Sequence, residues 1–179
     1  TSELEEGGEI VELRIEPFES KDAEEASLTR YGGIEEAKNE RLWSSGNKVP
    51  LKAMGWEWGR TVSLVARSQG KVIGIIYGNT IPMHVTSKPG KPIEVVQPTA
   101  DEPANRLEGE IYEVWVHPDY GGQGVEKQLI KEFMDRLKRQ GATAILAERV
   151  LSENKYLLNG LKELGFQKMA SYQDFKVKI

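Results

Sequence analysis

The N-terminal half of the chain carries two patterns that are typical of β-strands. Apolar and polar residues alternate over residues 10–18, which is the period of a strand with one buried face. Residues 61–67 and 72–81 are rich in β-branched side chains, and the sequence Ser-Gln-Gly-Lys separates them. Because Gly70 suits a tight turn, these two runs predict a β-hairpin.

Other segments have the spacing of helices. We expect short helices over residues 20–30 and 34–43, the first of them stopped by Gly32 and Gly33. Residues 123–140 predict a longer amphipathic helix that ends at Gly141. A last helix is expected to run from a cap at Ser152 to Leu164. The apolar face of the amphipathic helix consists of Val125, Leu129, Ile130, Phe133, Met134 and Leu137.

Four further strands complete the predicted order. They cover residues 109–117, 142–150, 166–170 and 174–179, which gives β-α-α-β-β-β-α-β-α-β-β without an internal repeat. Residues 1–9 are acidic and contain glycine, so we expect a disordered lead-in. Residues 10–179 then form a single domain, with a long proline-rich connection at residues 82–108. This order predicts an α/β (α+β) fold.

The composition excludes several kinds of chemistry. The chain has no cysteine and two histidines, so it has no thiol nucleophile, and a metal site is not expected. No run of 18 apolar residues occurs, which argues against a membrane span. Without cysteine or a visible secretory signal, the chain is expected to be cytoplasmic.

Charge is distributed unevenly along the chain. Residues 1–40 hold 13 acidic and 4 basic side chains, whereas residues 127–179 hold 6 acidic and 11 basic ones. The pattern fits two solvated faces, or a cationic ligand near the first segment and an anionic ligand near the second. No basic stripe interleaved with aromatic residues occurs, so a nucleic-acid partner is not expected.

Residues 113–130 are the most informative segment for function. A strand leads into a Pro-Asp turn, then into a loop with Gly121, Gly122 and Gly124, and then into a helix. Backbone N–H groups of such a loop and of a helix start can bind an anion. Neither the P-loop pattern of NTPases nor the dinucleotide-binding pattern fits, since Lys127 stands where the latter needs glycine. On these residues alone, the segment is also consistent with a plain strand-turn-helix connection that binds no ligand.

The sequence VWVHPDYGGQG at residues 114–124, followed by an amphipathic helix, resembles the acetyl-CoA signature of the GNAT superfamily of N-acetyltransferases. Asn154 and the sequence GLKELGF at residues 160–166 match the same family at its usual spacing. The resemblance covers about residues 109–170, while residues 10–81 match only in element order. It implies a mixed, mostly antiparallel sheet of about six to seven strands with about four flanking helices.

The resemblance also implies a reaction and the residues that carry it. An unidentified primary amine, on a small molecule or a peptide, attacks acetyl-CoA directly, without a metal or a covalent enzyme intermediate. Glu110 is the expected base, with Tyr112 beside the amine and the N–H of Val114 polarising the thioester. Alternation along the strand is taken to place these three side chains on one face, opposite Glu113 and Trp115. The residues expected to bind acetyl-CoA are Val114, Trp115, Val116, Gly121, Gly122, Gln123, Gly124, Val125, Glu126 and Asn154.

The sequence departs from the family pattern at three positions. Gly121 stands where the loop usually has Arg or Gln, and Glu126 where it has Gly or Ala. Leu161 replaces a tyrosine that serves many members as the acid for the departing thiolate. A catalytically weak or inactive module that binds CoA or a protein partner is therefore the alternative, and an unrelated nucleotide binder is a third. The last two predicted strands, residues 166–170 and 174–179, are compatible with pairing between two copies in a homodimer.

Overall fold

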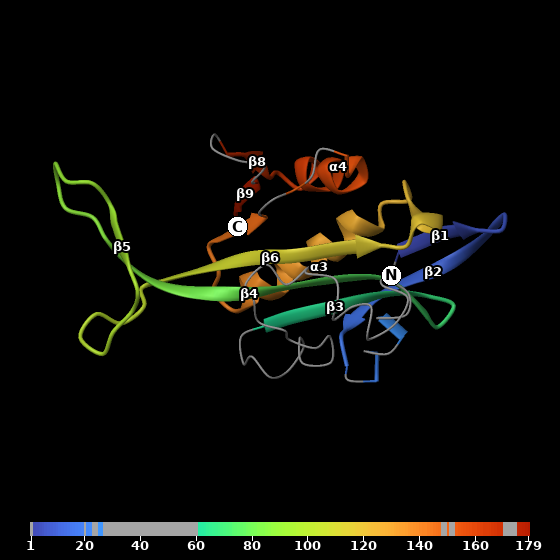
Figure 1. Cartoon of the computed structure of the whole chain (residues 1–179), viewed down its shortest axis with the longest axis horizontal. Coiled ribbons are helices and arrows are strands. Elements are labelled where there is room, and N and C mark those ends of the chain that lie inside the picture. The colour runs from blue at the N-terminus through green and yellow to red at the C-terminus, as the bar shows by residue number, and fades with distance from the viewer. Residues whose placement is uncertain are drawn as a thin grey trace.

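The computed structural model describes residues 2–19, 21–22, 25–26, 61–147, 150, 153–169 and 175–179. Their regular elements build one mixed sheet, two α-helices and a short 3-10 helix (Figure 1). In chain order these elements are β1 (Ser2–Glu6), β2 (Glu9–Pro17), β3 (Thr61–Ser68), β4 (Lys71–Thr86), β5 (Glu94–Val96), β6 (Arg106–Val116), η2 (Pro118–Tyr120), α3 (Val125–Arg139), β7 (Ala144–Ala147), α4 (Lys155–Glu163), β8 (Gln167–Lys168) and β9 (Phe175–Lys178).

The sheet has the strand order β1-β2-β3-β4-β6-β7-β9-β8, and β5 pairs with β4 outside that path. Among the described strands, β6 and β7 form the one parallel pair, and α3 connects them. A parallel pair needs such a crossover, because the chain must return to the same end of the sheet. In Figure 1, α3 lies behind β6 and β4, and α4 lies above β6, near β8. The prediction of a mixed sheet with flanking helices is confirmed.

Each face of the sheet has its own apolar core. On one face, α3 packs its fully buried Leu129, Ile130 and Phe133 against strands β2, β3, β4 and β6. The opposite face holds a smaller cluster of Phe18, Ala26, Val65, Val72 and Ile75, and Trp115 packs against it. The amphipathic pattern of residues 123–140 is therefore confirmed as the helix that covers the main core.

Residues 2–6 form strand β1 and not the disordered lead-in that their acidic composition predicted. β1 pairs with β2 over its whole length, and Gly7 and Gly8, both with positive φ, make the turn. Leu4 is 2 % exposed and belongs to the main core. Burial of Leu4 and the glycine turn thus stabilise a strand here in spite of the acidic charge of the segment. That residues 10–179 form a single domain stays a prediction.

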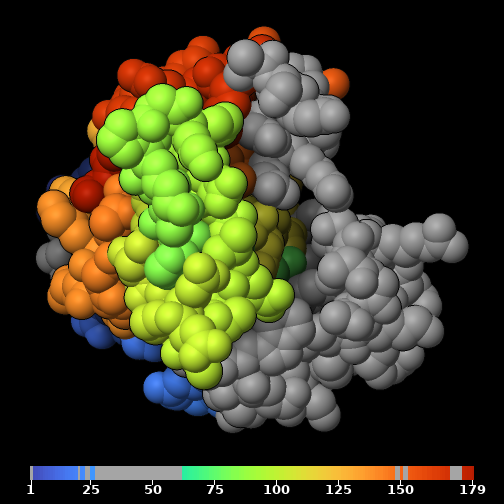
Figure 2. Space-filling model, turned by 90° about the vertical axis from the view of Figure 1, so that its left-hand side faces the viewer, coloured from blue at the N-terminus to red at the C-terminus, as the bar shows by residue number. Residues whose placement is uncertain are grey.

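The connection expected at residues 82–108 is shorter than predicted. β4 continues to Thr86, β6 begins at Arg106, and β5 pairs with the end of β4. The side-chain amide of Asn105 hydrogen-bonds to both the N–H and the C=O of Val85, at 2.8 Å each, and so replaces a strand partner. These residues form an arm that extends from the body (Figure 1) and stands at the front of Figure 2. β1 and β5 raise the strand number to nine, above the predicted six to seven.

The remaining element predictions have mixed outcomes. The hairpin of β3 and β4 and the closing strands β8 and β9 are confirmed. α4 begins after a cap at Asn154, whose side chain accepts a hydrogen bond from the N–H of Leu157, and not after Ser152. The predicted helix at 34–43 and most of the predicted helix at 20–30 lie outside the described residues.

We predict that Gly78→Ala destabilises the protein strongly. A Cβ atom at Gly78 would overlap the backbone oxygen of Glu110 and lie 2.7 Å from Cζ of Phe133. Overpacking of this kind costs about 3 kcal/mol of unfolding free energy, because both neighbours belong to the packed sheet and core. Urea unfolding measures the loss.

Gly90→Ala is the matched control. Gly90 has φ +73° but no atom within 4 Å of an added Cβ, so it should lose only about 1 kcal/mol of stability to backbone strain. Equal losses for the two variants would contradict the close approach of β4 to β6 at Gly78.

Candidate active site

Strand β6 contains a bulge that divides its residues into two groups. Against β4, Gly78 pairs with Ile111 while the preceding residue Tyr77 pairs with Glu113, so Tyr112 has no partner in the register. An inserted residue of this kind shifts the alternation of side chains by one position. The residues before and after Tyr112 must therefore be assigned to the two faces separately.

The bulge changes which side chains share a face. Before it, Ile111 belongs to the α3-side core and an added Cβ at Gly109 would overlap Leu137 of α3, so Glu110 faces the opposite side. After it, Val114 and Val116 pack against the α3-side core. The prediction that Val114 shares a face with Glu110 is therefore wrong.

Two acidic residues lie on the face opposite α3, one on each side of the bulge. Because Val114 faces α3, its neighbour Glu113 points the same way as Glu110. Both carboxylates are half-buried. The Tyr77 and Tyr112 rings meet nearby, with centroids 6.2 Å apart. This face therefore combines two carboxylates with two phenols. The prediction that Glu113 lies opposite Glu110 is wrong, and Tyr77 was not among the predicted site residues.

The outer half of β6 has one edge that no described strand covers. β6 pairs with β7 only from Glu108 to Ile111. The N–H of His117 bonds to the carbonyl of Ile73 in β4, at 2.7 Å. Since backbone groups of a strand alternate in direction, the N–H groups of Val116 and Val114 point away from β4. Two backbone donors thus face the edge that no described strand covers.

The glycine loop continues from this edge to α3. The ring of His117 accepts a hydrogen bond from the N–H of Asp119 and starts η2, in line with a turn role for this histidine. Gly122 and Gly124 both have φ +78°, a conformation that other residues rarely adopt. In the described structure, the N–H groups of residues 122–127 donate to no backbone carbonyl. The loop and the first turn of α3 therefore present a row of available donors.

The N-terminal hairpin holds the loop from outside. The N–H of Glu5 donates to Oε1 of Gln123 at 2.7 Å, and Nε2 of Gln123 donates to the carbonyl of Glu5 at 3.0 Å. Burial, together with a hydrogen bond to Glu6, raises the pKa of Tyr120, which lies at the start of the loop. Gln123 was predicted to bind the cofactor, but its side chain is engaged by β1. Glu5 was missed because its segment was predicted to be disordered.

The first turn of α4 covers the loop from the other side. An added Cβ at Gly121 would lie 2.8 Å from the ring of Tyr156, and one at Gly122 would lie 3.2 Å from it. The unusual glycine at position 121 therefore makes room for this tyrosine. Leu161 is fully buried in the core, so α4 offers no acid at that position. Asn154, predicted to bind the cofactor, caps α4.

Glu126 lies in the first turn of α3 and is buried, with 7 % of its surface exposed. Burial raises the pKa of its carboxyl group, and a hydrogen bond from its own backbone N–H partly opposes the shift. Lys127 does not compensate this charge, because its Nζ lies 2.8 Å from Glu163 of α4. Val125 is fully buried in the core, so only its backbone can contact a ligand at the loop.

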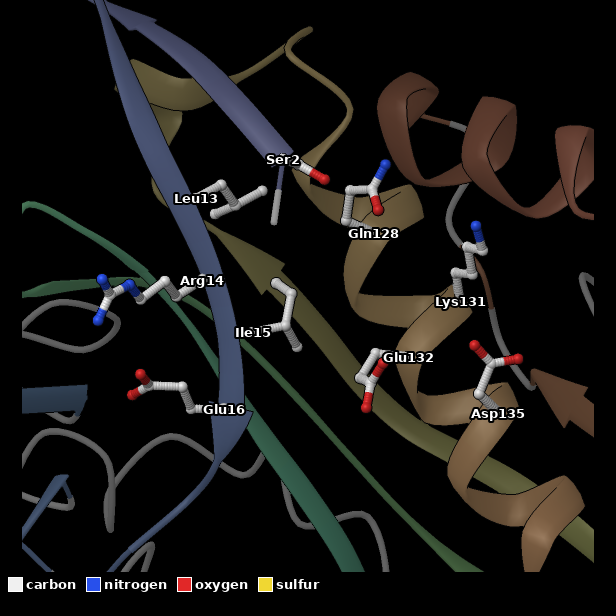
Figure 3. A pocket seen from close by; sticks show the side chains of 9 residues that line it. All are labelled: Ser2, Leu13, Arg14, Ile15, Glu16, Gln128, Lys131, Glu132 and Asp135. Carbon is white, nitrogen blue, oxygen red and sulfur yellow. The ribbon is translucent and has the colours of Figure 1, made fainter.

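A groove of about 390 Å³ lies between β2 and α3 (Figure 3). Leu13 and Ile15 point toward α3, whereas Arg14 and Glu16 point away from it. The groove contains none of the predicted site residues. Within the described residues, no group of acidic and histidine side chains could hold a metal ion, and no helix is long and apolar enough to cross a membrane.

We predict that the effects of Gly121→Ala and Tyr156→Ala on stability are coupled. Gly121→Ala forces the Tyr156 ring aside and should cost about 1 kcal/mol, and most of this cost should vanish when Tyr156 is already alanine. Thermal unfolding of the two single variants and the double variant measures the coupling. Additive effects would contradict the contact between α4 and the loop.

Comparison with known proteins supports one family. The family model described as Acetyltransferase (GNAT) family matches residues 36–166. No relative among curated protein sequences matches the chain. Three solved structures illustrate the likeness in fold.

The GNAT domain of S. lividans PAT is 17 % identical with a TM-score of 0.62, and the match covers 96 % of this chain and 92 % of that one. The putative acetyltransferase yncA from Salmonella typhimurium, solved with acetyl-CoA, is 17 % identical with a TM-score of 0.58 and 93 % coverage of each chain. The aminoglycoside N-acetyltransferase AAC(6′)-Iy, solved with CoA, is 17 % identical with a TM-score of 0.55, covering 89 % of this chain and 91 % of that one.

The family model spans well over half of the chain, and the mixed sheet with its crossover helix is the fold of these structures. The chain therefore belongs to the acetyltransferase (GNAT) family.

Proposed function

We propose that the protein is an N-acyltransferase that transfers an acetyl group from acetyl-CoA to a primary amine by direct attack. The observation that carries the proposal is the pair of backbone donor sets, one at the open edge of β6 and one at residues 122–127, which the turn at residues 117–121 connects. An extended pantetheine arm can pair with a strand edge, and a diphosphate can bind at a helix N-terminus. An acyl-CoA is one of few ligands that would use a strand edge and an adjoining helix N-terminus together.

The donor would lie along this row of N–H groups. Val114 and Val116 would pair with amides of the pantetheine arm, and the N–H of Val114 would stabilise the oxyanion that forms when the thioester is attacked. The N–H groups of residues 122–127 would bind the diphosphate. Trp115 would contribute through its backbone, since its side chain packs on the face opposite α3.

The acceptor amine would be activated on the carboxylate face. Glu110 is the proposed base, directly or through a water, with Tyr112 beside the amine. Glu113 lies on the same face beyond the bulge and is a second carboxylate within this half of the site. Their negative charge would also favour a cationic amine as it binds.

The chemical class of the acceptor is a primary amine on a small molecule or a peptide. Structural neighbours include AAC(6′)-Iy, which is named an aminoglycoside N-acetyltransferase, and a protein named ribosomal-protein-alanine N-acetyltransferase. The same fold therefore serves acceptors of both kinds. The departing CoA thiol needs little help from an acid, so a buried Leu161 is compatible with turnover.

The second candidate function is a module that binds CoA, or a protein partner, with little or no turnover. The buried carboxylate of Glu126 in the first turn of α3 favours it, because a negative charge beside the diphosphate would weaken the donor complex. Measured turnover with a panel of amines decides between the two functions.

We predict that acetyl-CoA stabilises the protein against heat, whereas ATP and NAD do not. A ligand at about 100 times its dissociation constant adds about 2.7 kcal/mol of stability, which raises the midpoint by several degrees. Differential scanning fluorimetry with each ligand up to the millimolar range measures the shift. A protein that responds to none of them, or only to ATP or NAD, does not have the proposed function.

We predict that Glu110→Gln lowers the rate of acetyl transfer about 100-fold or more, because the amine loses its base. The KM for acetyl-CoA should change little, since the carboxylate faces away from the donor edge. Steady-state kinetics with an amine that the wild type acetylates measures both parameters. Glu113→Gln is the comparison, and a larger loss in that variant would assign the base to Glu113.

A further inference from the structure

Glu126 differs from Asp22, the other buried acidic residue of the described structure. Asp22 is paired with Arg67, and the hydroxyl of Ser68 donates to Glu6 at 3.0 Å. Within the described residues, the Glu126 carboxylate has no hydrogen-bond or ion-pair partner on any other residue. A buried carboxylate without a cation is costly, so its persistence in the first turn of α3 calls for a physical explanation.

The position of Glu126 supplies that explanation. It is the second residue of α3, so its side chain starts among the N–H donors of residues 122–127. The side chain thus uses the positive end of the helix dipole, the feature that would bind a phosphate. On the α4 side, an added Cβ at Gly160 would lie 3.3 Å from the backbone nitrogen of Lys127, so the first turn is closely covered there.

We propose that Glu126 is a specificity-determining residue that acts as an internal competitor of the donor's diphosphate. The inference rests on the proposed function, because it assigns the row of N–H groups to an acyl-CoA. The carboxylate weakens binding of the diphosphate and leaves the pantetheine arm, which pairs along β6, unaffected. The protein therefore recognises its donor mainly through the pantetheine thioester. The diphosphate contributes less binding free energy than it would with an uncharged residue at position 126.

The test compares three probes that differ in their phosphate groups. CoA carries the diphosphate and a 3′-phosphate, dephospho-CoA keeps only the diphosphate, and pantetheine has neither. Isothermal titration, with displacement of CoA for the weak ligand, gives the dissociation constants for the wild type and for Glu126→Gln. Glu126→Ala restores the small residue usual in the family. Glu132→Gln removes the same charge from the same helix, about one and a half turns further along, and is the matched control.

We expect Glu126→Gln to bind CoA and dephospho-CoA about tenfold more tightly than the wild type, since one like charge near the diphosphate is removed. Pantetheine should change by less than about twofold, and Glu132→Gln should leave all three constants unchanged. Thermal unfolding without ligand checks folding, and Glu126→Gln should be at least as stable as the wild type.

Two results would overturn the inference while leaving the proposed function in place. In the first, Glu126→Gln binds CoA no better than the wild type does. In the second, all three probes gain equally, which would point to a change in packing and not in charge. Binding of CoA by Glu126→Gln but not by the wild type would support the inference in its strongest form. If the wild type and both Glu126 variants all fail to bind CoA, the proposed function and the inference fail together.

Discussion

The site depends on backbone N–H groups that neither the sheet nor α3 supplies with a carbonyl partner. Folded proteins rarely leave such donors unused, because each one costs free energy when it is removed from water. Here they occur in succession, first at the outer half of β6 beyond Ile111 and then in residues 122–127. The first set lies on the edge of β6 that no described strand covers beyond Ile111, and the start of α3 creates the second. The catalytic proposal follows from this arrangement of backbone rather than from any one side chain.

The elements around these donors hold them in place. Gln123 is bound to the backbone of Glu5 through both of its amide atoms, and Tyr156 of α4 lies against Gly121 and Gly122. A glycine-rich loop without such contacts would lose more conformational entropy when a ligand orders it. Support from β1 on one side and α4 on the other therefore favours ligand binding, because the loop is already ordered.

The sequence predicted the parts of the fold that depend on local pattern. The amphipathic period of α3, the glycine loop and the β3–β4 hairpin are each encoded within a short segment. The bulge at Tyr112 is not, because it depends on the register between β6 and β4 and on the missing side chain at Gly78. Strict alternation therefore placed Val114 beside Glu110, on the wrong face. In the same way, the acidic composition of residues 1–9 concealed the contribution of Leu4 to the core.

The two carboxylate features of the site act on different halves of the reaction. Glu110 and Glu113 lie on the face opposite α3, where an amine would be activated, whereas Glu126 lies at the start of α3, where the donor's diphosphate would bind. In the proposed mechanism, a charge beside the diphosphate would change how tightly acetyl-CoA is held, but it would not remove the base or the Val114 N–H from the reacting atoms. Weak donor binding and competent chemistry are thus compatible in one protein. In the proposed reaction, the sequence departure at Glu126 would therefore change donor affinity, while the amine would be activated on the face of β6 opposite α3.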